Sequence, residues 1–102
     1  QGLAQAQVYL GDCYGKGEGC LQDDAKAARL FKQAAEQDYL YGQHALGNCY
    51  RMGAGVEQDL EMALRLYTQA VEQGLADGHY ALGRCFAEGR GVVQDAEEAV
   101  KL

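Results

Sequence analysis

The feature of this sequence that most constrains its fold is an internal repeat of 36 residues. Among the 66 pairs of residues separated by 36 positions, 30 are identical, whereas chance pairing at this composition would give roughly a tenth. The segment LGDCY at 10–14 returns as LGNCY at 46–50 and as LGRCF at 82–86, each followed by a Gly-x-Gly pair and then by Gln-Asp. A period of this length is typical of solenoids, in which each copy is one supersecondary unit that stacks on its neighbours.

Each copy is predicted to form two antiparallel helices. In the first copy Ala6, Leu10, Cys13 and Tyr14 follow helical spacing and define the apolar face of a first helix, which ends at Gly17. Ala, Leu and Gln dominate the composition, while the chain has no Ile and few other β-branched residues. This balance favours helices over strands.

Aspartates and glycines mark the second helix of each copy. Asp23, Asp59 and Asp95 stand just before the second apolar pattern, where a carboxylate caps a helix. The glycines at 11, 47 and 83 lie inside the first helix, where Gly costs about 1 kcal/mol relative to Ala. We therefore expect the second helix to pack there too closely for a side chain.

The expected fold is all-α, a right-handed α-solenoid of antiparallel helix pairs. The 102 residues form a single solenoid fragment with repeats at 3–38 and 39–74 and a truncated one at 75–102. Residues 1–2 align with the end of a preceding repeat, so we expect the chain to be part of a longer array.

Charge and composition exclude several functions. The net charge is −6, with 15 acidic and 9 basic side chains, which argues against binding of nucleic acid, because phosphate contacts depend on Lys and Arg. No apolar run is long enough for membrane insertion. The chain has no Ser, which removes serine nucleophiles.

The repeat unit closely resembles the Sel-one-like repeat (SLR), a relative of the tetratricopeptide repeat. Residues 45–63 match the pattern almost position for position, with Ala45, Leu46, Gly47, Tyr50, Gly53, Gly55, Val56, Asp59 and Ala63. The first copy departs from it with Tyr9 for Ala and Cys20 for Val. The resemblance implies a helical solenoid that presents a surface to another protein, with the first helix of each repeat lining a concave groove.

The four cysteines are interpreted mainly as packing residues. Cys13, Cys49 and Cys85 recur every 36 residues on the buried face, and equivalent positions in stacked repeats lie too far apart for a disulfide. A Cys13–Cys20 disulfide stays open as an alternative, since cysteine-rich bacterial SLR proteins use intramolecular disulfides. Thiol redox or metal binding is a distant possibility.

No enzymatic site is expected. The Gly-x-Gly turns follow helices rather than strands and lack the Gly-Lys-Ser/Thr of a phosphate loop. His44 and His79 belong to different repeats and to different helix faces, so a shared metal site is not expected. We predict no catalytic residue, no metal and no cofactor.

The exposed face of the first helices is the predicted partner-binding surface. Its residues vary between repeats while the frame stays constant, and Tyr, Arg and Met are enriched at binding surfaces. The predicted concave-face residues are Tyr41, His44, Asn48, Arg51, Met52, Asp77, Tyr80 and Arg84. The first repeat offers Gln5, Val8, Asp12 and Lys16 at the equivalent positions.

The predicted function is a non-enzymatic protein-interaction scaffold. A peptide or helix of a partner protein would lie in the groove, with its carboxylates on Arg51 and Arg84 and its backbone on Asn48. The alternative is a structural spacer in a longer solenoid that binds elsewhere. The sequence leaves the compartment open, with the cytoplasm slightly favoured over an organelle lumen or secretion.

Overall fold

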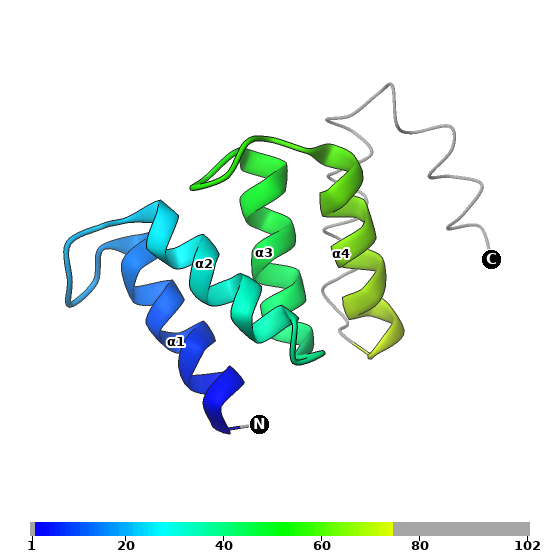
Figure 1. Cartoon of the computed structure of the whole chain (residues 1–102), viewed down its shortest axis with the longest axis horizontal. Helices are drawn as coiled ribbons and strands as arrows, with labels where there is room; N and C mark the ends of the chain where they lie inside the picture. The colour runs from blue at the N-terminus through cyan, green and yellow to red at the C-terminus, as the bar shows by residue number, and fades with distance from the viewer. Residues whose placement is uncertain (1, 75–102) are drawn as a thin grey trace.

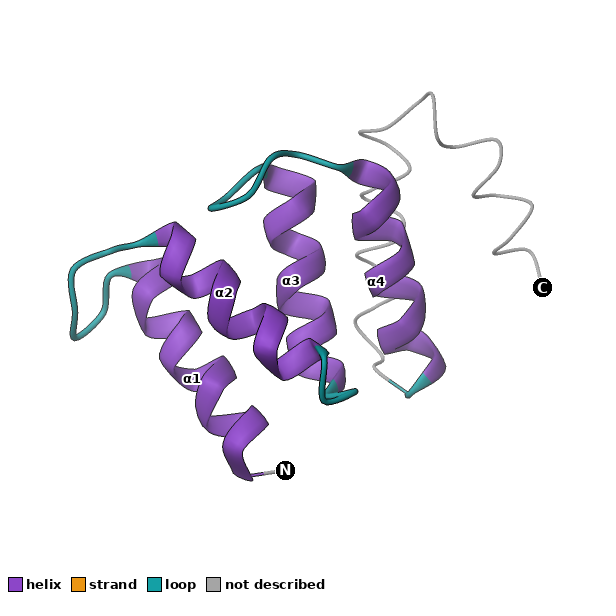
Figure 2. Cartoon of the chain, viewed as in Figure 1, coloured by secondary structure: helices purple, strands orange, loops and turns teal. Residues whose placement is uncertain are grey.

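Four helices make up residues 2–74, the part of the chain that the computed structural model describes. They are α1 (Gly2–Lys16), α2 (Asp24–Ala35), α3 (Leu40–Met52) and α4 (Leu60–Glu72). Each helix packs on the next, and successive helices run in opposite directions (Figure 1). Helices and loops account for all of residues 2–74, without a strand (Figure 2). The predicted all-α fold of consecutive helix pairs is confirmed.

The second helix of each pair begins at an aspartate cap. The side chain of Asp23 accepts a hydrogen bond from the backbone N–H of Lys26, and Asp59 accepts one from Met62, both at 3.1 Å. Each bond satisfies a backbone donor that has no partner inside the helix. The prediction is confirmed for these two caps, while Asp95 lies outside the described residues.

Glycine allows close packing within each pair. A Cβ atom on Gly11 would lie 2.6 Å from Cε1 of Phe31, and one on Gly47 would lie 2.7 Å from Cε1 of Tyr67. An aromatic ring of the second helix therefore contacts the backbone of the first helix directly. The predicted close approach is confirmed at both glycines, and Gly83 lies outside the described residues.

In each repeat, a hydrogen bond between two glutamine side chains connects the first half of the first helix to the end of the second helix. Nε2 of Gln37 donates to Oε1 of Gln7, and Nε2 of Gln73 donates to Oε1 of Gln43, both at 2.7 Å. Gln43 is buried, so this bond satisfies an amide oxygen that water does not reach.

One hydrophobic core contains residues of both repeats. Ala28 and Phe31 of α2, Leu46 and Cys49 of α3 and Leu66 of α4 belong to one buried cluster. The second helix of the first repeat therefore contributes to a core that continues into both helices of the second repeat, as a solenoid requires.

The apolar face predicted for the first helix is buried only in the second repeat. Leu46 is 6% exposed, whereas its counterpart Leu10 is 45% exposed, and Ala6 is exposed as well. Cys13 is only half-buried, in contrast to the buried Cys49. The expectation was wrong for α1 because α2 covers α3, while no helix within residues 2–74 lies on the corresponding side of α1.

Candidate functional site

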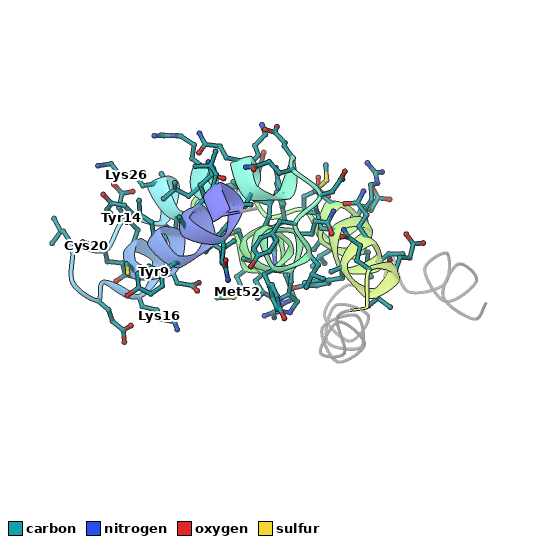
Figure 3. The ribbon with its side chains drawn as sticks, turned by 90° about the horizontal axis from the view of Figure 1, so that it is seen from below. Tyr9, Tyr14, Lys16, Cys20, Lys26 and Met52 are labelled. Atoms are coloured by element: carbon teal, nitrogen blue, oxygen red, sulfur yellow. The ribbon has the colours of Figure 1, made fainter. Side chains whose placement is uncertain are left out.

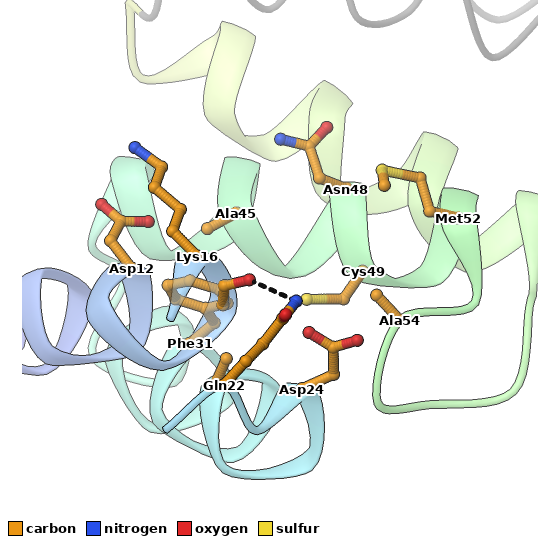
Figure 4. A pocket seen from close by; sticks show the side chains of 12 residues that line it. Asp12, Lys16, Gln22, Asp24, Phe31, Ala45, Asn48, Cys49, Met52 and Ala54 are labelled. Atoms are coloured by element: carbon orange, nitrogen blue, oxygen red, sulfur yellow. Dashed lines mark hydrogen bonds between the residues drawn. The ribbon is translucent and has the colours of Figure 1, made fainter. Parts of the chain in front are cut away.

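A hollow of about 350 Å³ lies between α1 and α3, over the first half of α2. Its residues come from both repeats: Asp12, Gly15, Lys16, Gln22, Asp24, Ala27, Phe31, Ala45, Asn48, Cys49, Met52 and Ala54. Ala27, Phe31 and Cys49 are buried and make its floor apolar. Figure 4 shows the α1 and α3 side chains on opposite sides of this space.

The hollow exists because both first helices rest on α2 and contact each other little. Gly15 adds to the space, since it places no side chain over α2. A Cβ atom there would lie 3.8 Å from Cβ of Ala27, which is an ordinary van der Waals contact. This part of α1 is therefore open.

Three of the four rim residues are polar, and all but the half-buried Asn48 are exposed. Asp12 and Lys16 border it on α1, and Asn48 and Met52 border it on α3 (Figure 4). Figure 3 shows Lys16 and Met52 on the side of the molecule opposite Lys26, a residue of α2. The hollow therefore opens on the face of the first helices that points away from the second helices.

A buried tyrosine determines how Asn48 presents its amide. Tyr67 is 0% exposed. Its hydroxyl accepts a hydrogen bond from Nε of Arg51 at 3.1 Å and donates to Oδ1 of Asn48 at 2.5 Å. Because Oδ1 accepts this hydrogen bond, Nδ2 is the atom of Asn48 that can donate outward. In the first repeat, Phe31 occupies the place of Tyr67 and lacks the hydroxyl.

Hydrogen-bond acceptors of Gln22 and Asp24 line the end of the hollow near Cys49. Nε2 of Gln22 donates to the carbonyl of Gly15 at 3.0 Å, shown as the dashed line in Figure 4. The carboxylate of Asp24 lines the same end. Burial, and secondarily the charge of Asp24, raises the pKa of the Cys49 thiol from 9.0 to about 11. The raised pKa disfavours the thiolate, which is the form that acts as a nucleophile or as a metal ligand.

The predicted partner-binding residues of the second repeat fall into two groups. Asn48 and Met52 line the hollow. Tyr41 is 52% exposed and its ring meets that of Tyr39 edge-on, with the ring centroids 5.5 Å apart. It stands on the surface but does not line the hollow.

His44 and Arg51 differ from the expectation that they face solvent. Both are half-buried, the ring centroid of His44 lies 5.7 Å from that of Tyr67, and Arg51 donates to the Tyr67 hydroxyl. A helical wheel of α3 does not show that the hydroxyl of Tyr67, in α4, lies beneath this part of α3.

The predicted residues Asp77, Tyr80 and Arg84 lie outside the described residues, as does Cys85. Sequence reasoning missed the contribution of α2 and the loop before it, namely Gln22, Asp24, Ala27 and Phe31. The signal that could have pointed to them is the apolar pattern of α2 combined with Gly15, which interrupts the side chains of α1.

The cysteines within residues 2–74 form no disulfide. Cys13, Cys20 and Cys49 are free thiols, so the alternative Cys13–Cys20 disulfide is absent from the structure. No three His, Cys, Asp or Glu side chains within residues 2–74 are arranged to hold a metal ion. In the same range, every helix is too short or too polar to cross a membrane.

Comparison with known proteins gives a consistent result. The Sel1 repeat model matches residues 4–39, 40–75 and 76–102. One similar solved structure is a protective antigen present in uropathogenic Escherichia coli strains that displays an SLR fold, with 39% identity and a TM-score of 0.80 over 90% of this chain. Another is a Sel1 repeat protein from Oxalobacter formigenes, with 31% identity and a TM-score of 0.76 over 81% of this chain.

These structures are longer than the chain described above. The chain covers 19% of the Escherichia coli protein and 62% of the Oxalobacter formigenes protein. No curated protein sequence matches it. The repeat model accounts for nearly every residue, and the chain therefore belongs to the Sel1 repeat family.

Proposed function

We propose that this chain binds a polypeptide segment of another protein in the hollow between α1 and α3. Sel1 repeats are typically interaction scaffolds and are usually not catalytic. The observation that carries the proposal is a surface cavity with a buried apolar floor and a polar rim, built jointly by two repeats. An apolar side chain of the partner would enter the floor, and polar groups of its backbone would meet the rim.

Asn48 is suited to contact the backbone of such a segment. The hydroxyl of Tyr67 donates a hydrogen bond to Oδ1 of Asn48. The Nδ2 hydrogens therefore remain to donate to a main-chain carbonyl of the partner. A donor held by a buried hydroxyl loses little freedom on binding. Met52 is 63% exposed beside it and offers a flexible apolar contact. Tyr41, His44 and Arg51, with Asp77, Tyr80 and Arg84 of the third repeat, would extend the same surface.

Filling the hollow is the direct test. Peptides selected from a random display library on the immobilised chain would be synthesised, and their affinities measured for the wild type and for Gly15→Leu. The leucine side chain would project into the hollow, and its Cβ would have room beside Ala27. Leu also favours the helix more than Gly does, so the variant should remain folded. We expect affinity to fall at least about tenfold.

The matched control is Gly2→Leu, at the other end of the same helix, where a Cβ atom meets nothing within 4 Å. It makes the same chemical change outside the hollow and should leave affinity unchanged. If the selected peptides bind Gly15→Leu as tightly as the wild type, the hollow is not the binding site and the proposal fails. A melting temperature measured for each variant separates loss of binding from loss of folding.

A further inference from the structure

We infer that the hollow prefers polypeptide segments in which a Lys or Arg side chain lies next to an apolar one. This inference rests on the proposed function and adds the charge of the partner. The apolar side chain would pack on Phe31 and Ala27, and the cation would lie beside the carboxylate of Asp24 and the side-chain carbonyl of Gln22.

The end of the hollow near Cys49 offers hydrogen-bond acceptors. The amide nitrogen of Gln22 donates to the Gly15 carbonyl, which leaves Oε1 as the free polar atom of that side chain. Asp24 adds a full negative charge and two more acceptor oxygens. An ammonium or guanidinium group satisfies such acceptors, whereas a carboxylate would meet repulsion.

The charges that line the hollow are unbalanced. Asp12 and Asp24 contribute two carboxylates, and among the lining residues within 2–74 Lys16 is the only basic side chain. Figure 4 shows the ammonium of Lys16 at the opposite end of the hollow from Asp24. Lys16 therefore leaves the negative charge of Asp24 available to a ligand.

The charge of Asp24 acts on the floor of the hollow. It contributes to the raised pKa of the Cys49 thiol, although burial is the larger cause. A charge that acts on the floor also acts on a cation placed beside it, and because Asp24 is exposed this interaction is screened by salt.

The acidic residues are particular to this hollow and are not part of the repeat frame. The counterparts of Asp12, Lys16 and Asp24 one repeat later are Asn48, Met52 and Leu60. In a repeat protein, residues that vary at equivalent surface positions distinguish one binding site from the next.

The test uses three fluorescent peptides that differ only in the residues flanking a central leucine pair, which are Lys, Gln or Glu. Binding to the full chain is measured by fluorescence anisotropy. We expect the Lys peptide to bind about threefold more tightly than the Gln peptide and about tenfold more tightly than the Glu peptide. The preference should shrink as salt is raised from about 0.01 M to about 1 M, since screening shortens from roughly 30 Å to roughly 3 Å.

Two variants assign this preference to Asp24. Asp24→Asn removes the charge at nearly constant size, and we expect it to abolish most of the difference between the Lys and Gln peptides. Glu61→Gln is the matched control, because Glu61 also lies in the first turn of a second helix but outside the hollow. It should leave the preference unchanged, although both variants remove a charge that interacts with a helix dipole.

The outcomes separate this inference from the proposed function. If Gly15→Leu weakens binding of all three peptides but their affinities are equal, or Asp24→Asn retains the preference, the charge inference is wrong and the proposed function survives. If Gly15→Leu leaves binding of every peptide unchanged, the hollow does not bind polypeptides and both fail.

Discussion

Replacement of Gly42 by alanine tests how the two repeats are joined. Gly42 lies in the first turns of α3, against the last residues of α2. A Cβ atom there would lie 2.7 Å from Cβ of Ala34, 2.8 Å from the backbone nitrogen of Ala35 and 2.9 Å from the carbonyl carbon of Ala34. Two of these three atoms belong to the backbone, so no change of rotamer relieves the overlap.

The magnitude follows from two opposing effects. Alanine stabilises a helix by up to about 1 kcal/mol relative to glycine. Overpacking typically costs about 1 to 3 kcal/mol, and a contact with rigid backbone in a fully buried position belongs at the upper end. We expect Gly42→Ala to lower the free energy of unfolding by about 2 kcal/mol, which corresponds to a decrease in melting temperature of roughly 10 °C for a chain of this size.

The assay is thermal unfolding of the full chain followed by circular dichroism, with Gly15→Ala as control. A Cβ atom at residue 15 has ordinary contacts, so this variant should show only the helix-propensity gain and melt a few degrees higher. The reasoning is refuted if Gly42→Ala melts at or above the wild-type temperature, because the helices would then not approach each other as closely as the structure shows.

Three further changes are measurable by unfolding or thiol chemistry. Tyr67→Phe leaves Oδ1 of Asn48 without its hydrogen bond and should cost about 1 to 2 kcal/mol in urea denaturation; an unchanged midpoint would contradict the bond. Asp59→Ala removes a helix cap and should cost about 1 kcal/mol in the same assay; an unchanged midpoint would show that this cap does not stabilise α4. Cys49 should react with a thiol reagent more slowly than Cys13 and Cys20 until the pH nears its pKa of about 11. Since unfolding returns that pKa to 9.0, stability should fall as pH rises from 9.0 to about 11, and Cys49→Ala should remove this part of the decline.

Local features of the fold could be predicted because each depends on residues close in sequence. The cap at Asp59 needs only a carboxylate three residues before a backbone N–H, and the left-handed backbone at Gly53, with φ of 71°, needs only a residue without a Cβ atom. The close approach at Gly47 could be inferred because a glycine inside a helix is costly without a packing reason. The period of 36 residues then extended these local predictions to a second helix pair.

The candidate site could be predicted only in part. Of the residues that the sequence analysis placed on the binding face of α3, Asn48 and Met52 line the hollow. A helical wheel describes one helix at a time, however, and cannot show which atoms of another helix lie beneath it. The hydrogen bond from Arg51 to the hydroxyl of Tyr67 joins residues 16 positions apart on different helices, so a helical wheel of α3 alone could not show it.

The sequence by itself determined that this chain forms helix pairs, that the second helices begin at Asp23 and Asp59, and that the two helices of a pair touch at Gly11 and Gly47, because these properties follow from local chemistry and from the repeat. Only the tertiary structure decided that Leu10 is exposed while Leu46 is buried, because burial depends on whether another helix covers the residue. It also decided where the hollow lies. Phe31 and Asp24 of α2 line the same hollow as Asn48 of α3 only because α2 packs against both first helices, and no single repeat specifies the contact between repeats.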